Sequence, residues 1–122
     1  MKTKEIFYSN LAQTTPFPIG LEIASAEGLF ITDTNGKSYY DMVSGLAVTN
    51  IGHRHPKVVK AIKDQLDSYM HVMPYGEFVQ TPQTELALKL NEILPANLTT
   101  SYFVNSGAES VEGALKLAKR YT

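Results

Sequence analysis

The chain has 122 residues, of which 43% are hydrophobic, and eleven basic and twelve acidic side chains leave a net charge of −1. This composition indicates a globular protein, and charge this balanced, with no basic stripe, argues against nucleic acid or an anionic membrane as a partner. Without cysteine there is no disulfide framework and no thiolate metal site, and residues 1–10 hold no apolar run of signal-peptide or membrane-spanning length, so we expect a cytoplasmic protein.

Three short stretches near the N-terminus predict strands, at residues 22–24, 28–32 and 37–40. The last two are joined by Asp33-Thr34-Asn35-Gly36, in which Asn and Gly tolerate the positive φ of a tight hairpin turn. We therefore expect a small antiparallel sheet in this part of the chain.

Two helices are predicted in the middle of the chain. Pro56 occupies a favourable first helical position, because its φ is preset and its missing N–H costs nothing there. The second helix should begin with Thr81 as N-cap and Pro82 as first residue, and should stop before Pro95. Apolar residues of the first helix recur at helical spacing: Val58, Val59, Ile62, Leu66 and Tyr69.

Residues 102–104 form a β-prone run, and a helical pattern follows directly from Ala108 onward. A strand, a glycine turn and a helix in this order predict the first unit of a parallel sheet, hence an α/β fold with a small antiparallel appendage. We expect residues 1–55 to form the segment with the small sheet, and residues 56–122 a helical connection and an incomplete larger domain. The last helix has neither a Gly cap nor a Pro stop, so we expect the chain to be part of a longer one.

The turn Asn105-Ser106-Gly107-Ala108 has two interpretations. Unpaired N–H groups and the positive end of a helix dipole would converge there, and Gly107 lacks the Cβ that would keep an anion away, so the turn could hold phosphate. Ser106 and Glu109 also match a capping box, which is a common way for a helix to begin. The tetrapeptide alone favours the ordinary cap.

Several longer motifs occur in one order along the chain, and together they resemble class III aminotransferases, in particular the acetylornithine and ornithine branch. The motifs are Gly28-Leu-Phe-Ile-Thr-Asp33, Asn35-Gly36-Lys37, Tyr40-Asp41, Ser44-Gly45-Leu-Ala-Val48, Gly52-His53-Arg54-His55-Pro56, Phe103-Val-Asn-Ser-Gly-Ala-Glu109, Glu112 and Ala114-Leu-Lys-Leu-Ala118. The resemblance spans residues 28–122.

This resemblance implies the N-terminal part of a fold-type-I enzyme that uses pyridoxal 5'-phosphate to move an amino group from an amino acid to a 2-oxo acid. It implies a homodimer with active sites across the subunit interface, and a cofactor phosphate held at Ser106, Gly107 and Ala108. In that family the Schiff-base lysine comes much later in the chain, so we assign no catalytic residue to these 122 residues. Lys116 and Lys119 are interpreted as solvated surface lysines.

The resemblance also implies substrate-side residues. The loop at Ser44 and Gly45 would border the substrate entrance, although it could equally be a plain connection between elements. Tyr75 could line the active site, but a loop tyrosine more often packs locally. The histidine pair around Arg54 lacks further ligands for a metal site, so we predict no metal and expect His55 to cap the helix that Pro56 opens.

A different function remains open at this point. The chain could be a small non-catalytic module that binds phosphate, or one that only interacts with another chain. The absence of a P-loop lysine and of a Gly-x-Gly-x-x-Gly pattern disfavours the phosphate-binding module. The sequence does not distinguish acetylornithine from ornithine or another ω-amino donor, with 2-oxoglutarate as the expected acceptor.

Overall fold

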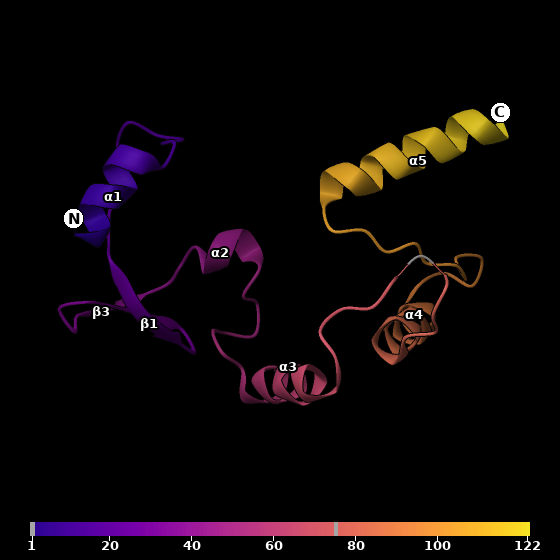
Figure 1. The fold of residues 1–122 in the computed structure, drawn as a ribbon, viewed down its shortest axis with the longest axis horizontal. Coiled ribbons are helices and arrows are strands. Elements are labelled where there is room, and N and C mark those ends of the chain that lie inside the picture. The colour runs from indigo at the N-terminus through magenta and orange to yellow at the C-terminus, as the bar shows by residue number, and fades with distance from the viewer. Residues whose placement is uncertain (1, 75) are drawn as a thin grey trace. The chain divides into compact units, whose positions relative to one another are not determined.

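The computed structural model describes residues 2–74 and 76–122. The chain forms two compact units, Met1–Met70 and His71–Thr122, each of which is described by itself. Figure 1 shows the helices and strands in chain order. The division predicted at residues 55 and 56 concerns the domains of the larger fold and stays a prediction.

The first unit holds three helices and three strands. These are α1 (Thr3–Asn10), β1 (Ile23–Glu27), β2 (Phe30–Asp33), β3 (Ser38–Tyr40), α2 (Ser44–Ala47) and α3 (Pro56–Ser68). The sequence pattern did not predict α1, which begins with a contact between the Lys2 N–H and Glu5 Oε2 at 3.0 Å.

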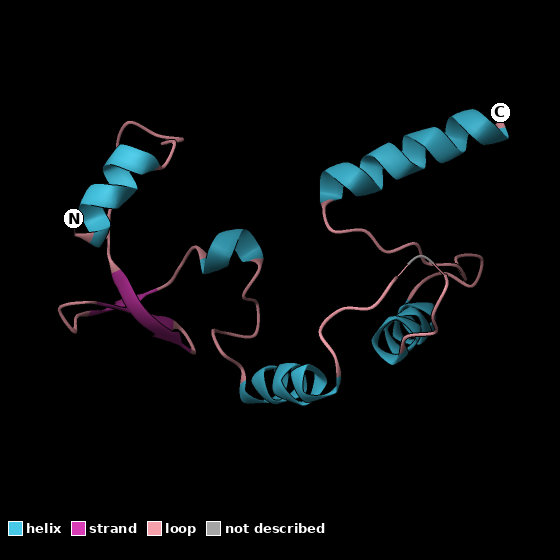
Figure 2. Ribbon diagram, viewed as in Figure 1, coloured by secondary structure: helices cyan, strands magenta, loops and turns pink. Residues whose placement is uncertain are grey.

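The strands form an antiparallel sheet in the order β1-β2-β3, which confirms the small sheet expected from the sequence (Figure 2). The β2–β3 hairpin turns where Asn35 and Gly36 predicted it, and Gly36 has a φ of 82°. Strand β1 reaches Glu27, further along the chain than residues 22–24, because it pairs with β2 as far as Phe30.

A buried carboxylate organises the hairpin turn. Asp33 is only 6% exposed, and its Oδ1 accepts hydrogen bonds from the N–H groups of Asn35 and Lys37, both at 2.9 Å. Its Oδ2 accepts from the Tyr39 hydroxyl at 3.0 Å. The Lys37 N–H above all holds the pKa of this carboxyl below its usual value, against the opposing effect of burial.

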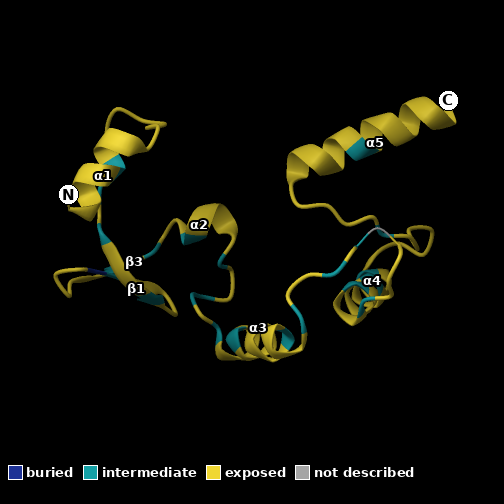
Figure 3. Cartoon of the chain, in the orientation of Figure 1, coloured by how far each residue is buried: buried dark blue, intermediate teal, exposed yellow. Residues whose placement is uncertain are grey.

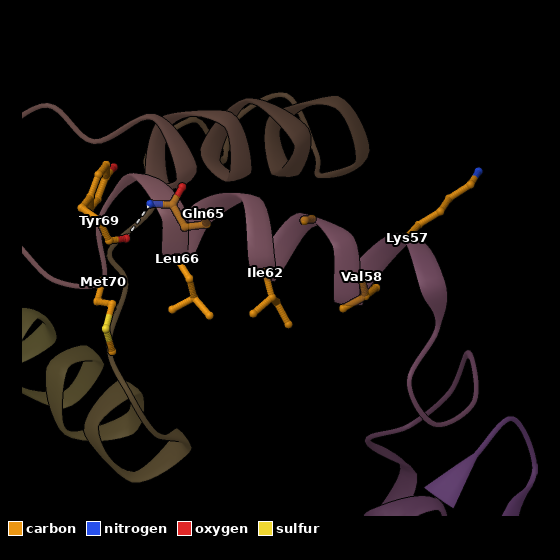
Figure 4. Close-up of a pocket in the computed structure, with 8 residues that line it drawn as sticks. Lys57, Val58, Ile62, Gln65, Leu66, Tyr69 and Met70 are labelled. Carbon is orange, nitrogen blue, oxygen red and sulfur yellow. Dashed lines mark hydrogen bonds between the residues drawn. The ribbon is translucent and has the colours of Figure 1, made fainter.

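Helix α3 begins at Pro56 as predicted. Val58, Ile62 and Leu66 lie along one side of it (Figure 4), and each is about half exposed, at 45%, 55% and 50%. No hydrophobic side chain is buried among the residues that the structure describes, and Figure 3 shows how little of the chain is covered. The apolar stripe of α3 is therefore present without a core around it.

The second unit holds α4 (Thr81–Ile93) and α5 (Gly107–Tyr121). The N-cap of α4 is Gln80, so the prediction that Thr81 caps this helix was wrong by one position. Pro82 therefore lies in the second helical position, where a missing N–H is equally harmless. The helix ends before Pro95, as expected.

The strand predicted at residues 102–104 is not found. A parallel strand requires a neighbour to pair with, and in the described ranges the three strands pair only with one another. The combination of a sheet with helices nevertheless confirms the α/β class.

Candidate functional site

The turn before α5 is a complete capping box. Ser106 has extended backbone angles (φ −144°, ψ 160°), and its Oγ accepts a hydrogen bond from the Glu109 N–H at 3.2 Å. In return, Glu109 Oε2 accepts from the N–H groups of Ser106 at 3.2 Å and Asn105 at 2.8 Å. The capping interpretation of this tetrapeptide is confirmed.

The cap leaves the next two N–H groups free. The first intrahelical bond runs from the Ser110 N–H to the Ser106 carbonyl at 3.1 Å, so Gly107 and Ala108 lie too early in the helix to have an intrahelical acceptor. Across residues 2–74 and 76–122 no other group accepts from either of them. Both groups lie at the N-terminus of α5, where the helix dipole is equivalent to roughly half a positive elementary charge.

Space at this turn also suits an anion. Apart from its chain neighbours and the backbone of its own helix, a Cβ placed on Gly107 would meet no atom of the described residues within 4 Å. The cap uses Ser106 and Glu109, whereas a phosphate would use the N–H groups of Gly107 and Ala108, so capping and anion binding are compatible. The donor set fits the phosphate of pyridoxal phosphate.

The loop at Ser44 and Gly45 has an unusual backbone. Its hydrogen bonds have helical spacing and define α2, but Ser44, Gly45, Leu46 and Ala47 all have left-handed φ values, of 51°, 59°, 60° and 65°. Gly45 has no Cβ and adopts this conformation without a steric cost. Each of the other three residues carries a Cβ and is destabilised by roughly 1–2 kcal/mol in it. Contacts outside the turn must therefore stabilise it.

Asp41 supplies such contacts. Its Oδ1 accepts from the N–H groups of Val43 at 3.0 Å and Ser44 at 2.9 Å, and its Oδ2 lies 2.7 Å from His53 Nε2. The Ser44 N–H, and after it His53, hold the pKa of the Asp41 carboxyl below its usual value. Both side chains of the pair are largely covered, with 14% of Asp41 and 20% of His53 exposed.

The backbone of His53 ties this loop to the sheet. His53 and Gly28 exchange two hydrogen bonds, from the His53 N–H at 2.8 Å and from the Gly28 N–H at 3.0 Å. Gly52, with a φ of 85°, comes so close that a Cβ on it would lie 3.1 Å from the Gly28 carbonyl oxygen. The turn between β1 and β2 therefore fixes the far end of the loop.

His55 behaves differently from the prediction. It occupies the N-cap position of α3, but its side chain makes no capping hydrogen bond, so the prediction that it caps the helix was wrong for the side chain. The His55 backbone (φ −51°, ψ 124°) does open the helix, because its carbonyl oxygen accepts the first intrahelical bond from the Val59 N–H at 3.0 Å.

Comparison with known proteins shows the family of the chain. The aminotransferase class-III family model matches residues 11–122. The chain belongs to the class-III aminotransferase family.

Its relatives carry more than one name. The chain is 45% identical over 100 residues to an acetylornithine aminotransferase of Archaeoglobus fulgidus, which covers 82% of the chain and 26% of that protein. It is also 45% identical over 101 residues to an adenosylmethionine-8-amino-7-oxononanoate aminotransferase of Anoxybacillus flavithermus, which covers 83% of the chain and 22% of that protein. The chain thus spans about a quarter of the length of these curated relatives.

Solved structures agree with the family. The adenosylmethionine-8-amino-7-oxononanoate aminotransferase of Methanocaldococcus jannaschii is similar with a TM-score of 0.85 and 30% identity, over 97% of this chain and 28% of that one. The acetylornithine aminotransferase of Elizabethkingia anophelis gives a TM-score of 0.75 and 32% identity, over 96% of this chain and 29% of that one. The resemblance inferred from the motifs is confirmed.

The structure groups the predicted site residues by unit. Ser106, Gly107 and Ala108 lie together at the start of α5, and Ser44 and Gly45 lie together in α2. Tyr75 lies outside the described residues. Asp41 was not singled out from the sequence as a site residue, and the tendency of an Asp side chain to bond the N–H two residues on, here that of Val43, is a local signal for its role.

Two further features bear on the sequence predictions. Lys116 Nζ lies 3.4 Å from Glu112 Oε2 on an exposed face, as a surface lysine would. None of the helices in the described part of the chain is long and apolar enough to cross a membrane.

Proposed function

We propose that this chain is the N-terminal segment of a transaminase that depends on pyridoxal phosphate. The observation that carries the proposal is the pair of free N–H groups at Gly107 and Ala108, at the start of a helix in a chain of the class-III aminotransferase family. A helix start with two unused donors is what a phosphate monoester requires.

In this proposal the residues of the turn hold and orient the cofactor. The N–H groups of Gly107 and Ala108 bind phosphate oxygens, and the Ser106 hydroxyl, whose oxygen already accepts from Glu109, can donate its own proton to a third. Pyridoxal phosphate, when bound, would supply the electron sink that stabilises a carbanion at the substrate carbon carrying the transferred amino group. The lysine that moves the proton there is supplied from outside these 122 residues.

The amino donor is proposed as acetylornithine, ornithine or another ω-amino compound, and the acceptor as a 2-oxo acid such as 2-oxoglutarate. Two relatives equally identical to the chain are named for different donors, so overall identity does not choose between them. The acceptor has support from one similar structure, a taurine:2-oxoglutarate aminotransferase of Bifidobacterium kashiwanohense.

The remaining site residues follow from the family. We propose that Ser44 and Gly45 border the substrate entrance, that Tyr75 lines the active site, and that the enzyme is a cytoplasmic homodimer. A left-handed turn held by outside contacts would present Ser44 to a substrate in one fixed orientation.

The test is a donor panel with the complete enzyme. The purified enzyme is mixed with pyridoxal phosphate, 2-oxoglutarate and either N-acetylornithine, ornithine or taurine, and glutamate formation is followed. Glutamate from at least one donor is expected, and no turnover with any of them would contradict the proposal.

The 122-residue chain alone serves as the control. It is expected to form no glutamate and to bind pyridoxal phosphate weakly, because an anion site open to water is screened and hydrated. Turnover by this chain after removal of any complete enzyme would require one of its own lysines to act as the Schiff-base residue.

A further inference from the structure

We propose that Asp41 and His53 are positioning residues, which hold the Ser44–Ala47 turn in its left-handed conformation for the transaminase reaction. The inference rests on the proposed function, because it assigns to this turn the substrate side of the active site. Neither residue is proposed to touch the substrate.

The first step of the argument is that the turn needs outside support. Ser44, Leu46 and Ala47 all have positive φ values, although each carries a Cβ that disfavours them. The bonds within the turn, from the Val48 and Thr49 N–H groups to the Ser44 carbonyl at 2.8 and 3.0 Å, do not remove that cost. An unsupported loop of this composition would relax to ordinary φ values.

The second step is that one carboxylate holds the start of the turn. Asp41 Oδ1 accepts from both Val43 and Ser44, and this fixes the direction in which the chain enters the left-handed segment. The Ser44 hydroxyl also lies 3.4 Å from the Asp41 carbonyl oxygen, so the side chain proposed to face the substrate is itself held by Asp41.

The third step is that His53 holds the carboxylate. Its Nε2 lies 2.7 Å from Asp41 Oδ2, and its backbone is bonded to Gly28 in both directions. The position of Asp41 is therefore set by the sheet, through His53, and not only by its own neighbours in the chain. The orientation of Ser44 therefore depends on His53, which lies twelve residues after Asp41 in the sequence.

The same unit contains a matched control. Asp33 accepts two backbone N–H bonds and one side-chain bond, like Asp41, but in the hairpin turn between β2 and β3. Removal of the Asp33 carboxylate should loosen the hairpin turn, and removal of the Asp41 carboxylate should loosen the Ser44–Ala47 turn. Only the Ser44–Ala47 turn is proposed to position a substrate.

The experiment compares Asp41→Ala, His53→Ala and Asp33→Ala in the complete enzyme. Asp41→Ala and His53→Ala should raise the KM for the preferred amino donor about tenfold and change kcat less than about threefold, because the loop that receives the donor is no longer preset. Asp33→Ala should lower the melting temperature and leave that KM within about twofold of the wild-type value. In His53→Gln the side-chain amide can still donate to Asp41, so the KM should return most of the way to the wild-type value.

A second measurement does not depend on turnover. In the cofactor-free enzyme, amide hydrogen exchange at Val43 and Ser44 should become at least about tenfold faster in Asp41→Ala and remain unchanged in Asp33→Ala. Should Asp41→Ala fail to fold, Asp41→Asn keeps Oδ1 as an acceptor and alters only the contact with His53, so it tests the same pair.

The outcomes separate the two proposals. Turnover by the wild-type enzyme together with an unchanged KM in the Asp41 and His53 variants would overturn the positioning role alone. Unchanged exchange at Val43 and Ser44 would overturn it as well. No turnover by the wild-type enzyme with any donor would overturn the proposed function, and this role with it.

Discussion

The turn at Ser106 and the loop at Ser44 are built in opposite ways. Every bond of the Ser106 cap joins residues no more than four positions apart, from Asn105 to Glu109 and from Ser106 to Ser110. The Ser44 loop instead depends on Asp41, His53 and the backbone of Gly28. A local cap can form wherever its helix forms, whereas the loop requires the sheet to be in place first. The comparison predicts that the two sites respond to different mutations.

The largest effect should come from Gly52→Ala. The new Cβ would lie 3.1 Å from the Gly28 carbonyl oxygen, and Ala would have to keep a φ of 85°. We expect a loss of about 2–3 kcal/mol in the free energy of unfolding of this unit, together with faster exchange of the loop amides. The α5 cap should not respond.

Gly28→Ala is the matched control for Gly52→Ala. Gly28 also has a positive φ, of 54°, but a Cβ there would meet no atom of the described residues within 4 Å other than its chain neighbours. Only the backbone cost of about 1 kcal/mol is therefore expected. Equal effects of the two substitutions in denaturant unfolding would show that the contact between Gly52 and Gly28 is not important.

The next effect concerns the other site. Gly107→Val should weaken binding of pyridoxal phosphate to the complete enzyme by about tenfold, close to 1.4 kcal/mol, because its side chain would enter the space left for phosphate. Folding should change little, since Gly107 has no positive φ and the space around it is open in this chain. Cofactor titration beside thermal unfolding measures both.

Gly113→Val provides the same substitution further along α5. A Cβ at Gly113 would lie 3.9 Å from Tyr102 Cε1, an ordinary contact distance, and away from the start of the helix. Cofactor affinity should stay at the wild-type value in this variant. An equal loss of affinity in both variants would trace the effect to the helix as a whole and not to the phosphate turn.

A smaller effect is expected from Ser106→Ala, which removes the cap of α5. Loss of a Ser N-cap costs about 1 kcal/mol, and it should appear as faster exchange at the Glu109 amide, which donates to Ser106 Oγ. Ser110→Ala, in the first turn of the same helix, should have no such effect. The Ser44 loop should be unchanged in both variants, and a change there would contradict the independence of the two sites.

The smallest effect should appear only in acid. The pKa of Asp41 is lowered in the folded chain, mainly by the Ser44 N–H, so the carboxylate stabilises the fold at pH values above the ordinary pKa of 3.8. That stability is lost as the pH falls through the still lower pKa of the folded state. Asp41→Asn should remove part of the acid dependence of unfolding below about pH 4. An identical acid dependence in wild type and variant would contradict this assignment.

The elements that the sequence predicted are those set by local chemistry. Asn35 and Gly36 predicted the hairpin turn, Pro56 predicted the start of α3, and Ser106 with Glu109 predicted the cap of α5. In each case the deciding residues lie within a few positions of the feature they determine. The family resemblance supplied what local chemistry could not, namely the proposal that the anion at Gly107 is the cofactor phosphate.

The features that escaped prediction depend on distant partners. Residues 102–104 have the composition of a strand but form none, because a strand is stabilised by its neighbour and not by its own residues. The left-handed turn after Asp41 has one glycine only, and nothing near it in the sequence points to His53 as its support. Contacts of this kind become visible only in the folded chain.

The bridge between Gly28 and His53 also sets the order in which this part of the chain can fold. It closes a ring that contains residues 29–52, and closing a long ring costs more entropy than closing the short β2–β3 hairpin inside it. Hairpins form in microseconds from local contacts, so β2 and β3 should pair early and the ring should close on a sheet that already exists. The Ser44 turn, which needs His53 in place, is then among the last features of this unit to acquire its native conformation.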